Sequence, residues 1–320
     1  MKPEVIDYLK VIEDEKDISE HLIPFDEIIA EPVGSAMKGF AMIKGEYIGE
    51  VYDIIRDNPN SHYRFCGDDF IRSVSKDEFS KMKYSAIIRK SRRGTDFAIS
   101  ELIGSRICEL FGIECPFVAP LGKSNTVVAS LDFLKYGQRM ETYAEYTGAM
   151  FDRKATAEDW ARAFSKTMEQ DNSYNLTNDK KKLLTKELIK HYIVRRFLLQ
   201  DNDFNCGNVA LVSDKNQNVN LVSFDFEYCL NNYILFNYSE AMPLNFMETN
   251  IKGLMESFPE EISEVINELQ ITPERYEAIN TIFSRFMDKG VADFWTYTIK
   301  RNSEMIEYYK NQYSQVKEML

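Results

Sequence analysis

The chain has 320 residues, of which 44% are hydrophobic and 13% aromatic, values typical of a globular protein with a sizeable core. A chain of this length is expected to form one large two-lobed unit or two domains. Acidic residues outnumber basic residues by 51 to 39, which gives a formal charge of −12. This charge argues against direct binding of nucleic acid or of an anionic membrane, because phosphate groups attract positive surfaces.

Cysteine and histidine usage argues against a disulfide framework and against a zinc site. The three histidines lie far apart in the sequence, and the cysteines lack CxxC spacing. The N-terminal residues have no apolar core of the signal-peptide type, and no apolar run reaches the roughly 20 residues of a membrane span. We therefore expect a cytoplasmic protein without membrane contact, with secretion of an effector that lacks a cleaved signal as the alternative. The five cysteines are Cys66, Cys108, Cys115, Cys206 and Cys229.

The first part of the chain is expected to be rich in strands. Glycines alternate with apolar residues over residues 34–55, and KYSAIIRKSRRG, residues 83–94, contains a short β-prone run. Residues 95–112 have apolar positions at helical spacing and end at Gly112, which predicts a helix. NTVVASLDFL, residues 125–134, predicts a further strand.

Helical patterns dominate after about residue 134. Thr156 and Thr272 stand where N-caps are expected, and Pro273 suits a first helical position. A strand-rich part with one prominent helix, followed by a mainly helical part, is an α+β plan in two lobes. The predicted helices cover residues 156–170, 180–200, 258–269, 272–286 and 292–320.

Residues 198–230, LLQDNDFNCGNVALVSDKNQNVNLVSFDFEYCL, carry the polar cluster that bears most on function. The acidic residues from Asp201 onward have the first spacings of a calcium-binding loop. However, such a loop needs its glycine one position before Gly207, and it needs a bidentate Glu at the twelfth position, where this chain has Val212. A calcium loop is therefore excluded.

The same stretch has the spacing of a phosphoryl-transfer site. In kinase catalytic loops an Asp precedes a metal-binding Asn by five positions, and a second metal-binding Asp follows on a neighbouring strand. Asp203 and Asn208 have this separation, and Asp225 follows a predicted hairpin that turns at DKNQN. Asp225 stands between apolar residues, so burial of its carboxylate would require a partner, which a bound cation would supply. The alternative is that Asp and Asn occur here because they suit turns.

A kinase also needs a strand lysine for the nucleotide phosphates and a helix glutamate that holds this lysine. Lys90 in SAIIRKS and Glu101 in the following helix provide these residue types. Lys90 would share a strand face with Ile88, as in a VAIK motif, and Arg89 is the rival for the role. The alternative is that both are solvated charges, one in a basic turn and one on a helix surface.

Four segments, in this order and spacing, resemble the HipA-like serine/threonine kinase family, in particular its short, stand-alone CtkA-like members. The segments are FAISELIGSRICELFGIECP, NTVVASLDF, FLLQDNDFNCGN and LVSFDFEYCL, which together span roughly residues 84–232. The resemblance implies a bilobal protein-kinase-like fold. Its N-lobe of strands and one helix would cover residues 1–130, and its mainly helical C-lobe would cover residues 131–320.

The resemblance also implies a role for each candidate residue at the catalytic centre. Asp203 would orient or deprotonate the acceptor hydroxyl, and Asn208 and Asp225 would bind Mg²⁺. Lys90 would bind the phosphates of ATP, with Glu101 as its ion-pair partner. The reaction would be transfer of the γ-phosphate of ATP to a Ser or Thr hydroxyl of a protein, with autophosphorylation.

The resemblance places the adenine-binding hinge at residues 129–133, with Ser130, Leu131 and Asp132 as cofactor-binding residues. A glycine-rich segment, PVGSAMKGF, residues 32–40, is the candidate for the loop that covers the phosphates, although it lies some fifty residues before Lys90. The expected partners are a protein substrate and an antitoxin, since HipA-type kinases often pair with a DNA-binding antitoxin.

One departure from the family pattern keeps other functions open. Phe204 and Asn205 follow the candidate catalytic Asp, where the family has Arg-His. The loss of this cation and imidazole motivates a pseudokinase that serves as an interaction module. An AMP-transferring enzyme on the same fold and a toxin- or antitoxin-type binding module are further alternatives.

Overall fold

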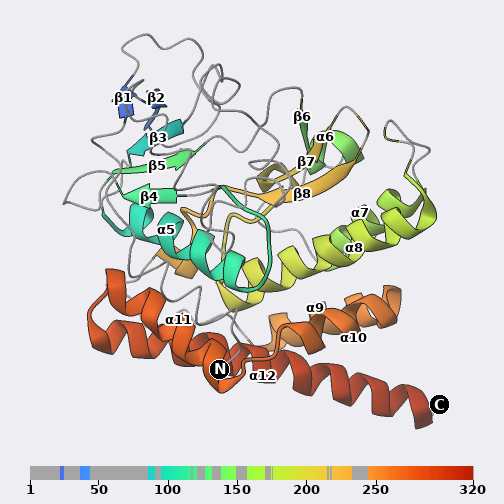
Figure 1. Cartoon of the computed structure of the whole chain (residues 1–320). Helices are drawn as coiled ribbons and strands as arrows, with labels where there is room; N and C mark the ends of the chain where they lie inside the picture. The colour runs from blue at the N-terminus through green and yellow to red at the C-terminus, as the bar shows by residue number, and fades with distance from the viewer. Residues whose placement is uncertain are drawn as a thin grey trace.

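The chain is helix-rich and contains two antiparallel sheets (Figure 1). The structure is a computed structural model. It describes residues 22–24, 37–43, 86–90, 95–116, 118–120, 127–131, 138–148, 157–169, 174, 176–214, 216, 218–232 and 244–319.

The first sheet has the strand order β1-β2-β3-β5-β4, and every neighbouring pair is antiparallel. Its β3 and β5 confirm the strands predicted around residues 83–94 and 125–134. The register places Met37 of β2 opposite Lys90 of β3, so residues 37–40 of the glycine-rich candidate segment belong to the strand beside Lys90, and the remainder of the segment lies outside the described residues. The strands are β1 (Leu22–Pro24), β2 (Met37–Ile43), β3 (Ala86–Lys90), β4 (Val118–Pro120) and β5 (Val127–Leu131).

Helix α5 (Thr95–Leu110) joins this sheet to the rest of the molecule. It contacts β4 and β5 as well as helix α11 and the short 3₁₀ helix η5 (Cys229–Asn232) (Figure 1). The helix ends at Leu110, and the predicted terminating residue Gly112 follows with a φ of +71°, which suits a residue without a Cβ. Gly112 donates to the Glu109 carbonyl at 2.8 Å and Ile113 donates to the Cys108 carbonyl at 2.9 Å. These bonds satisfy carbonyls that the helix end leaves free.

The second sheet contains the hairpin predicted from the polar cluster. Strand β7 (Val209–Ser213) pairs with β8 (Val219–Ser223), and the Asp214 side chain accepts bonds from the backbone of Asn216 at 2.7 Å and Asn218 at 2.9 Å. The third strand, β6 (Arg139–Thr142), is an addition to the elements predicted after residue 134. Its four residues are too few to show a strand pattern in the sequence. The strand is recognised by its antiparallel pairing with β7.

Seven α-helices are described after β6, and Figure 1 shows α9 to α12 layered beneath α5 and α8. They confirm the predicted helices, with α6 and α9 as additions. Thr272 caps α11 as predicted, since its Oγ1 accepts a bond from the Arg275 amide at 3.2 Å. The helices are α6 (Tyr143–Thr147), α7 (Ala157–Glu169), α8 (Asn178–Tyr192), α9 (Leu244–Ser257), α10 (Pro259–Glu268), α11 (Pro273–Phe286) and α12 (Lys289–Met319).

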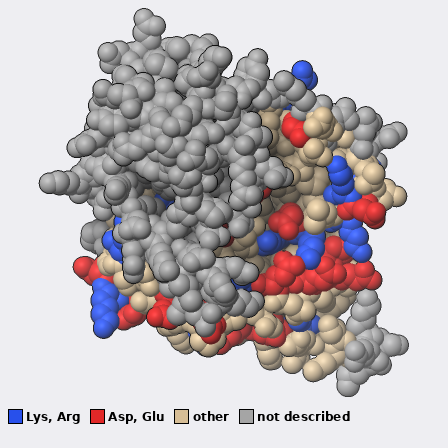
Figure 2. Space-filling view, viewed as in Figure 1, with Lys and Arg blue, Asp and Glu red and all other residues tan. Residues whose placement is uncertain are grey.

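The surface of the helical part carries paired charges. Lys186 of α8 lies 2.8 Å from Glu264 and 2.7 Å from Glu268 of α10, and Lys182 lies 3.3 Å from Glu260. Figure 2 shows acidic side chains in a band across the lower half of the described surface, with basic side chains beside it. Such exposed pairs contribute little to stability individually. Within the described ranges, every helix is too short or too polar to cross a lipid bilayer.

Candidate active site

The polar cluster begins where helix α8 changes its geometry. The helix continues into a π-helical segment, η3 (Ile193–Leu198), and the amide of Leu199 donates to the Val194 carbonyl at 2.8 Å. The Asp201 amide then donates to the Arg195 carbonyl, also at 2.8 Å. All residues of η3 are buried. Segments of this kind are rare and occur frequently at functional sites.

The loop after η3 is held by a buried ion pair between Arg195 and Asp201, whose side chains are both 0% exposed. Nε of Arg195 donates to Oδ2 of Asp201 at 2.8 Å, and Nη2 donates to the same oxygen. Arg196 donates to the Asp201 carbonyl at 2.6 Å. Burial disfavours the charged guanidinium, but the Asp201 carboxylate outweighs this effect, so the pKa of Arg195 is raised. Asp201 therefore has a protein cation as its partner.

The ion pair in turn orders the backbone around Asp203. Its amide donates to Oδ1 of Asp201 at 2.9 Å, and its carbonyl accepts bonds from the side-chain amides of Asn205 at 2.7 Å and Asn208 at 2.9 Å. The Asp203 side chain itself is half-buried. Because Asn208 donates through Nδ2, its Oδ1 is the atom that could bind a cation. Both predicted loop residues are thus held in place by short local bonds.

Asp225 follows β8 and has a φ of +63°. On one side of it, the Phe224 amide donates to the Asn208 carbonyl at 3.1 Å, and on the other the Phe226 amide donates to Oε2 of Glu101 at 2.6 Å. Asp225 is half-buried, and the cation that would accompany its carboxylate stays a prediction. The strand ends at Ser223, and the left-handed conformation at Asp225 turns the chain, so the alternation of β8 does not continue.

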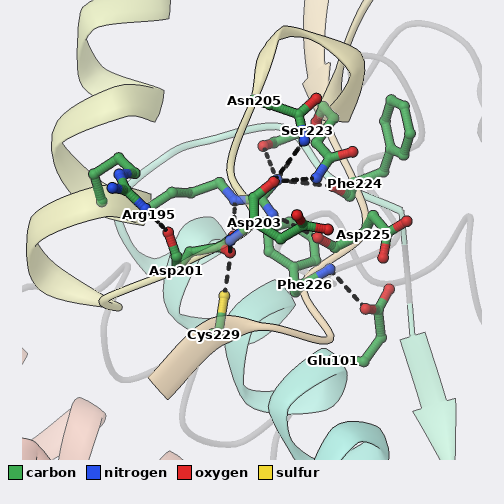
Figure 3. A network of polar contacts seen from close by, with 12 residues as sticks. Glu101, Arg195, Asp201, Asp203, Asn205, Ser223, Phe224, Asp225, Phe226 and Cys229 are labelled. Atoms are coloured by element: carbon green, nitrogen blue, oxygen red, sulfur yellow. Dashed lines mark hydrogen bonds and ion pairs between the residues drawn. The ribbon is translucent and has the colours of Figure 1, made fainter. Parts of the chain in front are cut away.

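Figure 3 shows how the predicted residues are arranged. Asp201 lies on one side of the network, Glu101 and Asp225 lie on the other, and Asp203 lies between them. The structure therefore brings Glu101 of α5 together with residues more than 100 positions later in the chain, as its bond to Phe226 shows.

The remaining predicted residues lie in the five-stranded sheet or beyond the described part. Lys90 is the last residue of β3, and its side chain is not described. Its pairing with Glu101 therefore stays a prediction, and Arg89 stays the alternative residue for this role. Ser130 is buried in β5 opposite Ile87, and Leu131 ends that strand. Asp132 lies outside the described residues. The hinge role of these residues stays a prediction.

The two residues that depart from the family pattern have structural roles. Phe204 is 1% exposed and stacks on Trp160 of α7, while Asn205 bonds to the Asp203 carbonyl and accepts a bond from the Gly207 amide at 2.8 Å. The guanidinium carbon of Arg195 lies 4.7 Å from the centroid of the Phe204 ring. A cation is therefore present beside residue 204, but it comes from the preceding helix.

The Arg195–Asp201 pair is not among the contacts predicted from the sequence. One signal could have found it, namely two adjacent arginines inside an otherwise apolar run, YIVRRFLL, residues 192–199. A buried arginine needs a carboxylate or several acceptors, and Asp201 is the first carboxylate after the run. Ser223, which is fully buried and accepts a bond from Arg195 at 2.9 Å, carried no comparable signal.

The cysteines near the site have buried thiols, and burial makes them unreactive. The described ones, Cys108, Cys115, Cys206 and Cys229, are free and buried. Burial raises the pKa of the Cys108 thiol to about 12, and it also raises the pKa of Cys206 and of Cys229. These thiols stay protonated near neutral pH. Cys206 and Cys229 therefore act as small buried hydrophobes beside the site.

The donor set of the site bears on which cation it could hold. Over the described ranges, no group of three or more His, Cys, Asp or Glu side chains could hold a metal ion. Asn208 and Asp225 offer one amide oxygen and one carboxylate. Mg²⁺ in nucleotide sites is held by one or two carboxylates together with phosphates and water. The residues present therefore fit Mg²⁺ bound with a nucleotide, and they do not fit zinc.

Comparisons with protein families and with curated proteins found no match. Among solved structures, the chain is similar to the proinflammatory kinase CtkA of Helicobacter pylori, at 14% identity and a TM-score of 0.47, over 72% of this chain and 88% of that chain. It is also similar to HipA of Shewanella oneidensis, solved in a complex with HipB and operator DNA. That similarity has 11% identity and a TM-score of 0.47, over 72% of this chain and 60% of that chain. Neither similarity assigns a function to this chain.

Proposed function

We propose that the chain is a Mg-ATP-dependent serine/threonine protein kinase of HipA-like type, which transfers the γ-phosphate of ATP to a protein hydroxyl. The proposal depends on one observation, the linkage of the three candidate residues within a single hydrogen-bonded network. Asn208 donates to the Asp203 carbonyl at 2.9 Å, and the Phe224 amide beside Asp225 donates to the Asn208 carbonyl at 3.1 Å. Phosphoryl transfer requires a carboxylate and metal ligands at one place, so this linkage supports the proposal.

Each residue has a defined part in the proposed reaction. The Asp203 carboxylate would accept a hydrogen bond from the acceptor hydroxyl and orient it toward the phosphate. Oδ1 of Asn208 and the carboxylate of Asp225 would hold Mg²⁺, which neutralises phosphate charge when bound. Glu101 would hold Lys90 against the phosphates, in addition to its bond to the Phe226 amide at 2.6 Å.

A pseudokinase is the second candidate, and the Phe204 environment favours it. Phe204 is built into the core where the sequence resemblance places an arginine, so the loop carries no cation of its own at this position. A pseudokinase would keep nucleotide binding and lack transfer. The two candidates differ in one measurable quantity, the covalent addition of phosphate.

The test is incubation of the purified chain with Mg²⁺ and γ-labelled ATP, followed by intact-mass analysis. A kinase adds the mass of one or more phosphates, an AMP-transferring enzyme adds the mass of AMP, and a pseudokinase adds no mass. We expect Asp203→Ala to retain Mg-ATP binding and to lose transfer by about 10²–10⁴-fold. We expect Asp225→Ala to lose the thermal stabilisation by Mg-ATP.

Asp214→Asn is the matched control for both variants. Asp214 lies in the turn of the same hairpin, and its side chain stabilises the turn by accepting hydrogen bonds from two backbone amides. The side-chain oxygen of Asn can accept the same bonds. It should bind Mg-ATP and transfer phosphate like the unmodified chain. If Asp225→Ala is stabilised by Mg-ATP as strongly as the unmodified chain, the assignment of the site is wrong. An antitoxin partner, expected from the sequence resemblance, is tested separately by co-purification.

A further inference from the structure

The guanidinium of Arg195 connects the two backbone segments that carry the candidate catalytic residues. Nη1 donates to Oγ of Ser223 at 2.9 Å, to the Phe224 carbonyl at 2.7 Å and to the Asn208 carbonyl at 3.4 Å. Nη2 donates to the Asp225 carbonyl at 2.5 Å. Together with the bonds to Asp201, all three nitrogen atoms of the guanidinium donate, in a fully buried setting.

The same guanidinium also packs against one aromatic ring from each of the two segments. The guanidinium carbon lies 4.7 Å from the centroid of Phe204 and 4.3 Å from that of Phe226. Phe204 directly follows Asp203, and Phe226 directly follows Asp225. Each candidate carboxylate is therefore one residue away from a ring that packs on Arg195.

We propose that Arg195 is a positioning residue, whose guanidinium sets the position of segment 201–208 relative to segment 223–226. It thereby fixes the Asp203 carboxylate with respect to the Asp225 carboxylate. Its effect on turnover rests on the proposed kinase function, whereas its effect on the two segments does not.

The chemistry of the site requires a guanidinium at this position. A planar fork with five N–H donors can bind Asp201 along one edge and the carbonyls of residues 224 and 225 along another, while aromatic rings pack against its flat surface. An ammonium group has three donors at one point and no flat face, so Lys could satisfy Asp201 but could not link both segments. Arg195→Lys therefore keeps the charge and removes the link.

The first test is hydrogen–deuterium exchange of the full chain without ligand. For Arg195→Lys we expect exchange to rise about tenfold in the peptides that cover residues 201–209 and 223–230, since charge-assisted bonds are lost there. Arg196→Lys is the matched control. Arg196 is also buried and bonds to the Asp201 carbonyl at 2.6 Å, but its guanidinium packs over Phe246 of α9. The control should leave exchange in residues 223–230 unchanged.

An ordinary structural role would give a different exchange pattern. If Arg195→Lys leaves both segments protected, or raises exchange evenly over the whole chain in proportion to a lower global stability, the proposal is overturned. Ser223→Ala keeps the test decisive should Arg195→Lys fail to fold, because it removes one acceptor of Nη1. It should raise exchange in the same two segments to a smaller degree, and unchanged exchange there would contradict the proposal.

The second test uses activity. Arg195→Lys should lower kcat by about a hundredfold, since small misplacements of reacting groups have effects of this size. It should also raise the Mg²⁺ concentration that gives half-maximal phosphate transfer. Arg196→Lys should leave this concentration unchanged. A loss of folded protein alone would lower the rate without moving the Mg²⁺ dependence. If the unmodified chain transfers no phosphate, the proposed kinase function fails, while the exchange experiment still decides the role of Arg195.

Discussion

The ring of Phe204 lies parallel to the indole of Trp160, with the ring centroids 5.1 Å apart. Phe204 comes from the loop of Asp203, Trp160 comes from helix α7, and both belong to the same hydrophobic core. Both side chains are almost fully buried. The residue next to the candidate catalytic Asp is therefore anchored by apolar stacking, where the sequence resemblance leads one to expect a cation.

Replacement of Phe204 by the arginine of the family pattern should destabilise the protein. Phe204→Arg would bury a second guanidinium beside Arg195 without a carboxylate of its own, at a cost of about 3–5 kcal/mol. Phe204→Leu stays apolar and should cost about 1–2 kcal/mol. Urea unfolding followed by circular dichroism measures both variants. Equal stability of Phe204→Arg and the unmodified chain would show that residue 204 is not held in the core.

Gly104 is expected to be required for the position of Asp225. A Cβ added at Gly104 in α5 would lie 2.6 Å from Cβ of Phe226 and 3.0 Å from Sγ of Cys229. Gly104→Ala should therefore push residues 225–229 away from α5, lower the melting temperature and weaken Mg-ATP binding in a thermal-shift titration.

Gly290→Ala is the control for this substitution. Gly290 lies in helix α12, and a Cβ there has open space around it. It should leave the melting temperature unchanged or raise it slightly, because Ala has a higher helix propensity than Gly by about 1 kcal/mol. A melting temperature of Gly104→Ala equal to that of Gly290→Ala would contradict the close packing of α5 on Phe226.

Two substitutions at Glu101 should distinguish the contribution of its hydrogen bond to Phe226 from the contribution of its negative charge. Glu101→Gln retains an oxygen acceptor for the Phe226 amide, so we expect a change in unfolding free energy of at most about 1 kcal/mol. Glu101→Ala leaves this buried amide without its acceptor and should cost about 1–3 kcal/mol. If Glu101 also pairs with Lys90, Glu101→Gln should lower phosphate transfer at nearly unchanged stability. Transfer by Glu101→Gln at the unmodified rate would argue against the ion pair.

His191 should make the protein less stable in mild acid. Burial, with smaller effects of Lys190 and Arg195, lowers the pKa of His191 from 6.5 to about 3. Below pH 6.5 the unfolded chain binds a proton that the folded chain does not, so the stability of the fold decreases as the pH falls toward 3. Between pH 7.5 and pH 5.0 this loss amounts to about 2 kcal/mol.

The measurement compares urea unfolding of the unmodified chain and of His191→Leu at both pH values. Nδ1 of His191 has no hydrogen-bond partner among the described residues, so an apolar side chain fits its surroundings. The variant should lose about 2 kcal/mol less than the unmodified chain between the two pH values. An identical pH dependence in both proteins would mean that His191 is protonated in the folded state.

The local elements and the candidate loop could be predicted from the sequence because their signals are short-range. The apolar spacing before Gly112, the cap at Thr272 and the turn at Asp214 involve residues within a few positions of each other. The separation of Asp203 and Asn208 is equally local, and one hydrogen bond joins them. Helix period, turn chemistry and loop spacing act over such distances, so they can be read before the chain is folded.

Only the tertiary structure decided how these elements meet. Glu101 and Phe226 are bonded across 125 positions, and Met37 lies opposite Lys90 despite the long segment between them. The π-helical end of α8 leads into the ion pair of Arg195 with Asp201, six positions later, and no helical or strand period predicts such a contact. Asp225 is left half-buried at a left-handed residue where the chain turns after β8. These contacts depend on packing between distant segments, and burial then determines which charges must be paired.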